Sequence, residues 1–228
     1  MPITTCVFDA YGTLFDVAAA ARQAATEPAF VAIQDNWPQL AEHWRLKQLQ
    51  YSWLRAITDS YCNFWTVTQD GLDWALEKTG HDGDGPLRER LLQLYWELGA
   101  YPEVPAMLQN LKAAGLNTAI MSNGSPAMLR GAVESAGIAD TLDALLSVES
   151  VGVFKPDFRN YDLVAAEFGC AKDEVLFVSS NGWDAAGATG YGFTTAWVNR
   201  TAEPMDRLPW QPAHVLADLT GIPALAGV

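Results

Sequence analysis

The stretch VFDAYGTLFD, residues 7–16, places a carboxylate at the end of an apolar run. Val7 and Phe8 come directly before Asp9, and Tyr11 follows two positions later. Such a run is consistent with a buried strand that ends at the acid. In open parallel α/β sheets, ligands bind beyond the carboxyl ends of the strands. Asp9 is therefore the first candidate for a functional side chain.

Short apolar runs alternate with helical patterns along the rest of the chain. Strands are predicted at residues 3–8, 116–121, 175–178 and 194–198. Helices are predicted between them, at residues 104–114, 127–136, 160–168 and 184–189. This alternation predicts an α/β fold in which a parallel, Rossmann-like sheet is built with right-handed crossovers.

Residues 17–100 interrupt the alternation with helical patterns rich in aromatic side chains. The segment is too long for an ordinary loop. We interpret it as a helical cap domain at 17–100, inserted into an α/β core domain of residues 1–16 and 101–228. Its acidic stretch HDGDGP, residues 81–86, suggests calcium but lacks the later glutamate of a calcium loop, so it is interpreted as a turn.

Composition excludes several classes of function. Half of the 228 residues are hydrophobic, which predicts a globular protein, and the net charge of −13 repels nucleic acid and anionic membranes. No apolar run reaches the length of a membrane span, and no signal peptide is recognised. Three widely spaced cysteines favour reduced thiols and a cytoplasmic location.

Polar residues follow three of the predicted strands: Asp9, the pair Ser122 and Asn123, and the triplet at 179–181. Lys155 lies in a loop between the predicted strands at 116–121 and 175–178, and Asp184 follows the second of these two strands. Each feature alone has an ordinary explanation, such as a helix cap for Asp9 or Ser122 and a surface position for Lys155. Their combination at one edge of a sheet is more specific.

Several motifs resemble the haloacid dehalogenase superfamily, and most closely its L-2-haloacid dehalogenase branch. They are DAYGTLFD at 9–16, WRLKQLQYSWL at 44–54, SNGSP at 122–126, KPDFRNY at 155–161 and SSNGWD at 179–184. The resemblance spans nearly the whole chain. It implies hydrolysis of short L-2-haloalkanoic acids to D-2-hydroxy acids and halide, with no cofactor and no metal. It also implies a homodimer.

Two departures from the phosphatases of that superfamily support this branch. Those enzymes carry an acid two residues after the nucleophile and another four residues before the last aspartate, where this chain has Tyr11 and Ser180. A neutral phenol is a poor proton donor, and the lost carboxylate weakens a magnesium site. A departing halide needs neither. The alternatives are a magnesium-dependent phosphatase of the same superfamily and a non-catalytic binding module of the same fold.

The resemblance also implies roles for individual residues. Asp9 is the nucleophile that forms an aspartyl ester, and Lys155 favours its ionised form. Asp184 is the expected partner of Lys155, with Tyr161 supporting that pair. Thr13 is expected to orient Asp9. Ordinary core packing is the alternative for Tyr161.

Further residues are implied in binding water and substrate. Ser179 and Asn181, with Asp184, are expected to hold the hydrolytic water, and Ser122 with backbone amides of the first turn to bind the substrate carboxylate. For the halide the candidates are Arg45 and Asn123. Apolar contacts to the substrate are expected from Tyr11, Leu49, Phe64 and Trp183. The alternatives are a solvated surface arginine at 45 and core packing for Phe64 and Trp183.

Overall fold

The computed structural model describes residues 2–228 and contains a six-stranded sheet in which every neighbouring pair is parallel. The strand order is β3-β2-β1-β4-β5-β6, so β1 lies between β2 and β4. Their bounds are β1 Thr5–Phe8, β2 Asn117–Ser122, β3 Ala144–Ser147, β4 Val175–Ser179, β5 Thr194–Val198 and β6 His214–Leu216. The predicted fold class is confirmed.

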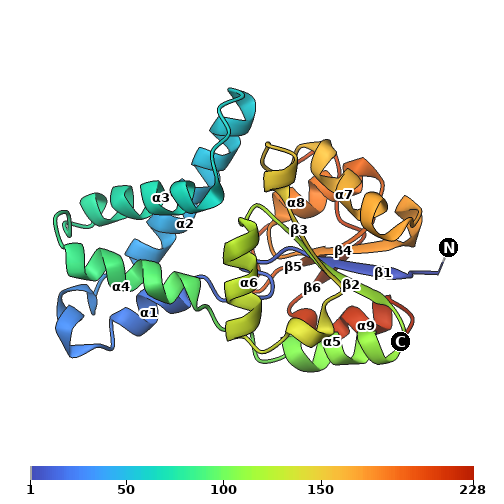
Figure 1. Cartoon of the computed structure of the whole chain (residues 1–228), viewed down its shortest axis with the longest axis horizontal. Coiled ribbons are helices and arrows are strands. Elements are labelled where there is room, and N and C mark those ends of the chain that lie inside the picture. Colours follow the sequence, from blue (N-terminus) through green and yellow to red (C-terminus); the bar gives the residue numbers. More distant parts are fainter. Residues whose placement is uncertain (1) are drawn as a thin grey trace.

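Helices cover both faces of this sheet (Figure 1). On one face lie α5 (Val104–Ala113) and α9 (Ile222–Leu225), and on the other α7 (Phe158–Phe168) and α8 (Gly182–Tyr191). The period-two alternation of β1 produces the two layers. Cys6 and Phe8 belong to the apolar cluster of the first face, and Val7 to the cluster of the second, with Phe177.

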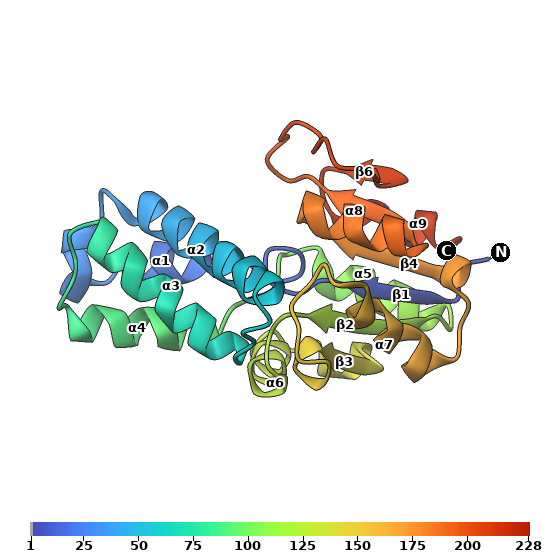
Figure 2. The same ribbon diagram turned by 90° about the horizontal axis from the view of Figure 1, so that it is seen from above.

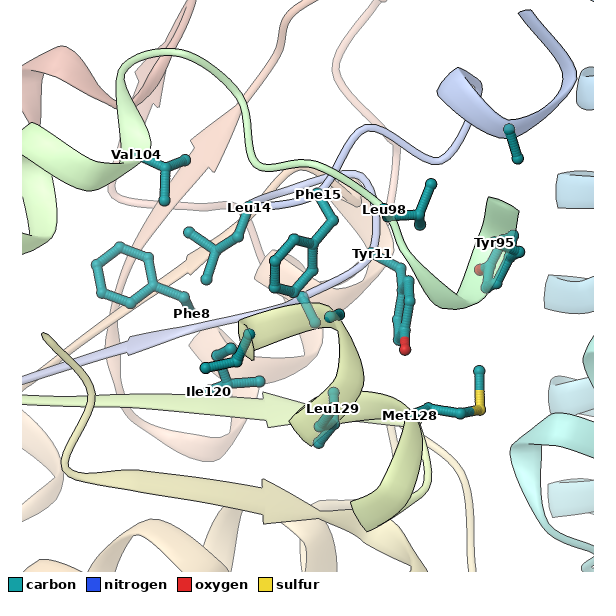
Figure 3. Close-up of a cluster of buried hydrophobic side chains, with 14 of the residues drawn as sticks. Phe8, Tyr11, Leu14, Phe15, Tyr95, Leu98, Val104, Ile120, Met128 and Leu129 are labelled. Carbon is teal, nitrogen blue, oxygen red and sulfur yellow. The ribbon is translucent and has the colours of Figure 1, made fainter. Parts of the chain in front are cut away.

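The larger cluster extends from the sheet toward residues 19–96 (Figure 3). Phe8, Leu14 and Phe15 pack with Ile120 of β2, and α6 (Pro126–Ser135) closes the cluster from the side. Tyr11 and Tyr95 lie on the cap side of the part drawn in Figure 3, and the cluster continues from them among the cap helices. The turn after β1 is thus anchored in the core by its apolar residues.

Four helices form a separate group beyond the carboxyl ends of the strands, as both ribbon views show (Figures 1 and 2). They are α1 (Ala19–Ala24), α2 (Trp37–Ile57), α3 (Phe64–Lys78) and α4 (Gly85–Trp96), with a 3-10 helix at Pro28–Ile33. We propose that they form the cap of residues 17–100, and the boundaries of the two domains stay a prediction. In the described part of the chain, no helix combines the length and apolarity that crossing a membrane requires.

The two connections between cap and sheet run side by side. The amide of Tyr101 donates to the carbonyl of Leu14 at 2.9 Å, and the amide of Asp16 to that of Gly99 at 3.3 Å. A β-bridge joins Phe15 and Ala100. Because the chain leaves and returns at one place, the turn after β1 is held between core and cap.

The stretch at residues 81–86 is a turn that leads into a helix. Asp84 caps α4, its side chain accepting a hydrogen bond from the amide of Leu87 at 3.0 Å. The side-chain amide of Asn36 lies 3.0 Å from the ring nitrogen Nε2 of His81. Asp84 therefore has a structural role as a helix cap.

Two strands were not predicted from the sequence. They are β3 and β6, the edge strands of the sheet, with four and three residues. Length alone does not explain this, because β1 also has four residues. The edge strands are only partly buried, whereas β1 and β4 are buried throughout. Helix α8 also begins earlier than predicted, which places Asp184 within its first turn. Short 3-10 helices occupy Ala139–Thr141, Val148–Ser150, Lys172–Glu174 and Leu219–Gly221.

Two leucines of α2 provide a matched test of the packing between the cap helices. Leu40 is fully buried, whereas Leu54 is 57% exposed on the same helix. We expect Leu40→Ala to lower the free energy of unfolding by about 2–5 kcal/mol, because it leaves a cavity. Leu54→Ala should change it by less than about 0.5 kcal/mol. Urea denaturation measures both, and equal effects would contradict this packing.

Candidate active site

The ammonium group of Lys155 lies at the centre of a buried polar cluster. Its Nζ donates to Asp9 Oδ1 at 2.9 Å, to Asp184 Oδ2 at 2.7 Å and to the carbonyl of Met121 at 3.1 Å. Lys155 is 1% exposed, so these contacts replace water entirely. Because an ammonium has three donors, all of them are satisfied here.

Burial and charge act in opposite directions on this cluster. Burial by itself lowers the pKa of Lys155, but the carboxylates of Asp184 and Asp9 outweigh it and the pKa is raised. Burial raises the pKa of Asp184, and its contact with Lys155 opposes that rise. Lys155 therefore stays charged at neutral pH and provides the positive charge that faces Asp9.

Asp9 leaves β1 at the middle of the sheet, with its second carboxylate oxygen held from two sides. Thr13 Oγ1 and Asn181 Nδ2 each donate to Asp9 Oδ2 at 3.0 Å. The turn that brings Thr13 back requires Gly12, whose φ is +90° and where a Cβ atom would lie 3.2 Å from Ser180 Oγ. Asp9 is thus fixed in one orientation, and it is 5% exposed.

Arg45 reaches this cluster from the cap. It lies in the interior of α2. Its Nη2 donates to the carbonyl of Tyr11 at 3.0 Å and to Asn181 Oδ1 at 3.1 Å. Asn181 therefore joins the guanidinium of the cap to the carboxylate of Asp9. The alternative of a solvated surface arginine does not describe this residue.

Ser122 ends β2 beside this cluster. Its Oγ accepts a hydrogen bond from the amide of Gly124 at 3.1 Å, so its own hydrogen is available for another acceptor. The cap of α6 is Ser125, whose hydroxyl accepts from the amide of Met128 at 3.4 Å. Ser122 thus does not serve as the helix cap.

Asn123 and Ser179 support the loops around the site. Asn123 Oδ1 accepts from the amide of Lys155 at 2.9 Å, which leaves its NH2 group as the donor that can face a ligand. Ser179 Oγ accepts from the amide of Asn181 at 3.1 Å. Both side chains therefore hold neighbouring residues of the cluster in place.

Tyr161 has a polar contact as well as a place in the core. Its hydroxyl donates to Asp184 Oδ1 at 2.8 Å, and its ring packs edge-on against Phe177. Burial, followed by the nearby Asp184 carboxylate, raises the pKa of Tyr161, so it stays a neutral donor. Lys155 and Tyr161 together bind both oxygens of Asp184.

Aromatic rings line the cap side of the cluster. Tyr11 stacks on Tyr95 with ring centroids 5.5 Å apart, and Phe64 lies 6.0 Å from Tyr11. Burial raises the pKa of Tyr11 well above its ordinary value, so this phenol does not act as an acid near neutral pH.

Two other predicted contacts lie further along α2 and at the start of α8. Trp183 packs edge-on against Trp53 and lines an apolar groove with Phe154. Leu49 is half-buried on the turn after Arg45. Their contacts with a substrate stay predictions.

Three further residues in this region were missed by sequence reasoning. Gln48 binds Arg45 and could have been suspected, because residues three apart are neighbours on a helix. Arg200 follows β5 and donates to the carbonyl of Thr13 at 3.1 Å, a position that the strand-end rule predicts. Tyr95 gave no signal, since only packing between helices brings it to Tyr11.

The residues around Lys155 include two carboxylates, Asp9 and Asp184. Ser180, which bonds Thr13, stands where the related phosphatases carry a further acid for magnesium. Within residues 2–228 no three His, Cys, Asp or Glu side chains gather as a metal site would require. The arrangement instead provides an oriented carboxylate beside a fixed ammonium. Such a pair is suited to nucleophilic attack by the carboxylate.

Comparisons with known proteins agree with this geometry. A haloacid dehalogenase-like hydrolase model matches residues 3–192. The chain is 42% identical to (S)-2-haloacid dehalogenase 1 of Pseudomonas sp. (strain CBS-3), covering 98% of this chain and 96% of that protein. It is 44% identical to the (S)-2-haloacid dehalogenase of Xanthobacter autotrophicus, covering 88% of this chain and 77% of that protein.

The backbone also resembles that of a solved dehalogenase structure. The L-2-haloacid dehalogenase from Xanthobacter autotrophicus, with chloropropionic acid covalently bound, superposes with a TM-score of 0.87 at 37% identity. The match covers 99% of this chain and 98% of that one. Sequence and fold agree over nearly the whole length, and the chain belongs to the haloacid dehalogenase-like hydrolases, in the group of the (S)-2-haloacid dehalogenases.

Proposed function

We propose that this chain hydrolyses short L-2-haloalkanoic acids to D-2-hydroxy acids and halide through an ester formed on Asp9. The observation that carries the proposal is the carboxylate of Asp9, bound on one oxygen by Lys155 and on the other by Thr13 and Asn181. A nucleophile fixed in this way meets a bound substrate in one orientation. Relatives that carry the name (S)-2-haloacid dehalogenase support the reaction class.

In the first step, a carboxylate oxygen of Asp9 attacks the carbon that bears the halogen. A carbon–oxygen bond forms on the side opposite the carbon–halogen bond, which breaks as the halide leaves with the electron pair. Configuration is thereby inverted. Support for a covalent step comes from the Xanthobacter autotrophicus structure, in which chloropropionic acid is covalently bound.

In the second step, water attacks the carboxyl carbon of the Asp9 ester. The bond between the Asp9 carboxyl carbon and the ester oxygen breaks, and one proton of the attacking water goes to the departing alkoxide, which leaves as the hydroxy acid. The other proton is released to solvent, and Asp9 regains a carboxylate that contains one oxygen from water. Lys155 stabilises the oxyanion that forms on the way. Ser179, Asn181 and Asp184 stand next to Asp9 and are proposed to hold the water.

Substrate binding is proposed to use both sides of the cluster. Ser122 has a free hydroxyl hydrogen and, with backbone amides of the turn after β1, binds the substrate carboxylate. Arg45 and the NH2 group of Asn123 bind the departing halide. The apolar wall consists of Tyr11, Leu49, Phe64 and Trp183.

We propose that neither metal nor cofactor takes part. A halide leaves without a proton, and the acids with which related phosphatases supply one and bind magnesium are replaced by Tyr11 and Ser180. The high pKa of Tyr11 supports this. A phosphatase would need the two acids that this chain lacks. A non-catalytic module would have no use for a buried Asp9, Lys155 and Asp184.

We also propose, by resemblance, a cytoplasmic homodimer. The three cysteines are free thiols, and Val31 and Ile57 expose apolar side chains on the cap. Exposed apolar residues of this kind occur where subunits meet.

Equilibrium sedimentation should give twice the mass of one chain. A monomer at micromolar concentration would contradict the dimer, and cell fractionation would test the location.

The ester can be tested by one turnover in heavy-oxygen water with enzyme in excess over L-2-chloropropionate. We expect label in the peptide that contains Asp9, because water attacks the carboxyl carbon. Asp9→Asn should release no halide, since an amide is a poor nucleophile. The exposed Asp140→Asn serves as the control and should keep full activity. Label found only in the hydroxy acid would exclude the ester.

Metal independence separates the two enzyme functions. Halide release from 2-chloropropionate should be unchanged after dialysis against a chelator, and added magnesium should not increase it. Hydrolysis of p-nitrophenyl phosphate with magnesium should stay at background. Loss of halide release on chelation, restored by magnesium, would contradict the proposal.

A further inference from the structure

A buried amide joins three helices of the cap directly behind Arg45. Gln48 of α2 is 1% exposed and lies between Thr68 of α3 and Tyr95 of α4. These three polar side chains have no contact with water, so each depends on the others for its hydrogen bonds. The cluster is separate from the carboxylates of the sheet, and Arg45 and Asn181 connect it to Asp9.

The direction of each hydrogen bond in this cluster follows from Arg45. Its Nη1 donates to Gln48 Oε1 at 3.0 Å. A guanidinium has donors only, so the amide oxygen must face it and the amide NH2 must face the other way. That NH2 donates to Thr68 Oγ1 at 2.8 Å, and Thr68 donates in turn to the carbonyl of Phe64 at 2.8 Å.

Tyr95 closes the cluster from the third helix. Its oxygen lies 3.0 Å from Gln48 Nε2 and 3.2 Å from Gln48 Oε1. The ring is held by Trp44 at 4.9 Å and stacks on Tyr11. If the amide of Gln48 turned over, its NH2 would face the donors of Arg45, and Thr68 would have to give up its bond to the carbonyl of Phe64 in order to donate to Gln48.

This arrangement determines where the guanidinium of Arg45 points. With Nη1 held by Gln48, Nη2 is directed at the carbonyl of Tyr11 and at Asn181 Oδ1. A free arginine side chain loses considerable rotamer entropy when it is ordered, and a preformed contact removes that loss from the binding step. An amide also holds the guanidinium without a charge of its own, whereas a carboxylate would neutralise it.

We propose that Gln48 is a positioning residue, which holds the Arg45 guanidinium in its anion-binding orientation and leaves its positive charge available to the halide. The inference rests on the proposed halide-binding role of Arg45. Thr68 and Tyr95 act through Gln48 by fixing the direction of its amide.

The test measures the inhibition constant for bromide during hydrolysis of L-2-chloropropionate. Gln48→Met removes the hydrogen bonds at nearly constant length, and Gln48→Glu keeps the shape but adds a negative charge. Both should weaken bromide binding by about tenfold or more, because Gln48→Met removes the acceptor that holds Arg45 and Gln48→Glu neutralises its charge. For Gln48→Glu the loss should shrink as the pH falls toward the ordinary pKa of a glutamate. The control is Gln50→Glu on the same helix, whose partner is Lys47 and which should bind bromide normally.

The background of Arg45→Ala separates positioning from structural damage. There, Gln48→Met should cause no further loss of bromide affinity, because the group that it positions is absent. An equal loss in both backgrounds would make Gln48 a structural residue and overturn the inference. Tyr95→Phe, which keeps the stacked ring, should also weaken bromide binding and provides the test if a Gln48 variant does not fold.

The proposed role of Arg45 can fail separately. If Arg45→Ala alone leaves the bromide constant unchanged, Arg45 is not the halide ligand and the proposed function must be revised at that point. If Arg45→Ala weakens bromide binding but both folded Gln48 variants behave like the parent, Arg45 keeps its role and the positioning inference is wrong. Circular dichroism at the assay temperature establishes that each variant is folded.

Discussion

The buried ammonium of Lys155 is the group on which the rest of the site depends. It is shared by Asp9, at the end of β1, and Asp184, in the first turn of α8, and none of the three is more than 5% exposed. Removing such charges from water is expensive, and their attraction offsets that only when the remaining hydrogen bonds are also made. The carbonyl of Met121 and the hydroxyl of Tyr161 complete them. The position of Lys155 is therefore set by several elements at once.

The order of the strands explains why these groups meet. Because β1 lies between β2 and β4, Asp9 has Ser122 on one side and Ser179 on the other. The loop with Lys155 and the start of α8 approach from the face that carries Tyr161. A parallel sheet brings the carboxyl ends of its strands to one edge, and segments far apart in the sequence therefore meet at one site.

The cap adds what the sheet lacks. On the sheet side, the single ammonium of Lys155 faces two carboxylates, so little positive charge remains for a second anion. Arg45 supplies that charge from α2, and Asn181 connects it to Asp9 with one hydrogen bond on each side of its amide. Attack on a halogenated carboxylate needs a nucleophile and an anion site close together. In the proposed mechanism the nucleophile, Asp9, comes from the core and the anion site, Arg45, from the cap.

Local pattern in the sequence was enough to predict the alternating strands and helices, and with them the α/β class and Asp9, Ser122 and Asn181 at strand ends. The motifs around these residues pointed to the family. The strands β3 and β6 were missed, and both lie at an edge of the sheet where they are only partly buried. Only the tertiary structure decided which charges pair, and that Gln48, Thr68 and Tyr95 stand behind Arg45. Those contacts join helices whose separation along the chain leaves no trace in local pattern, since packing alone brings their faces together.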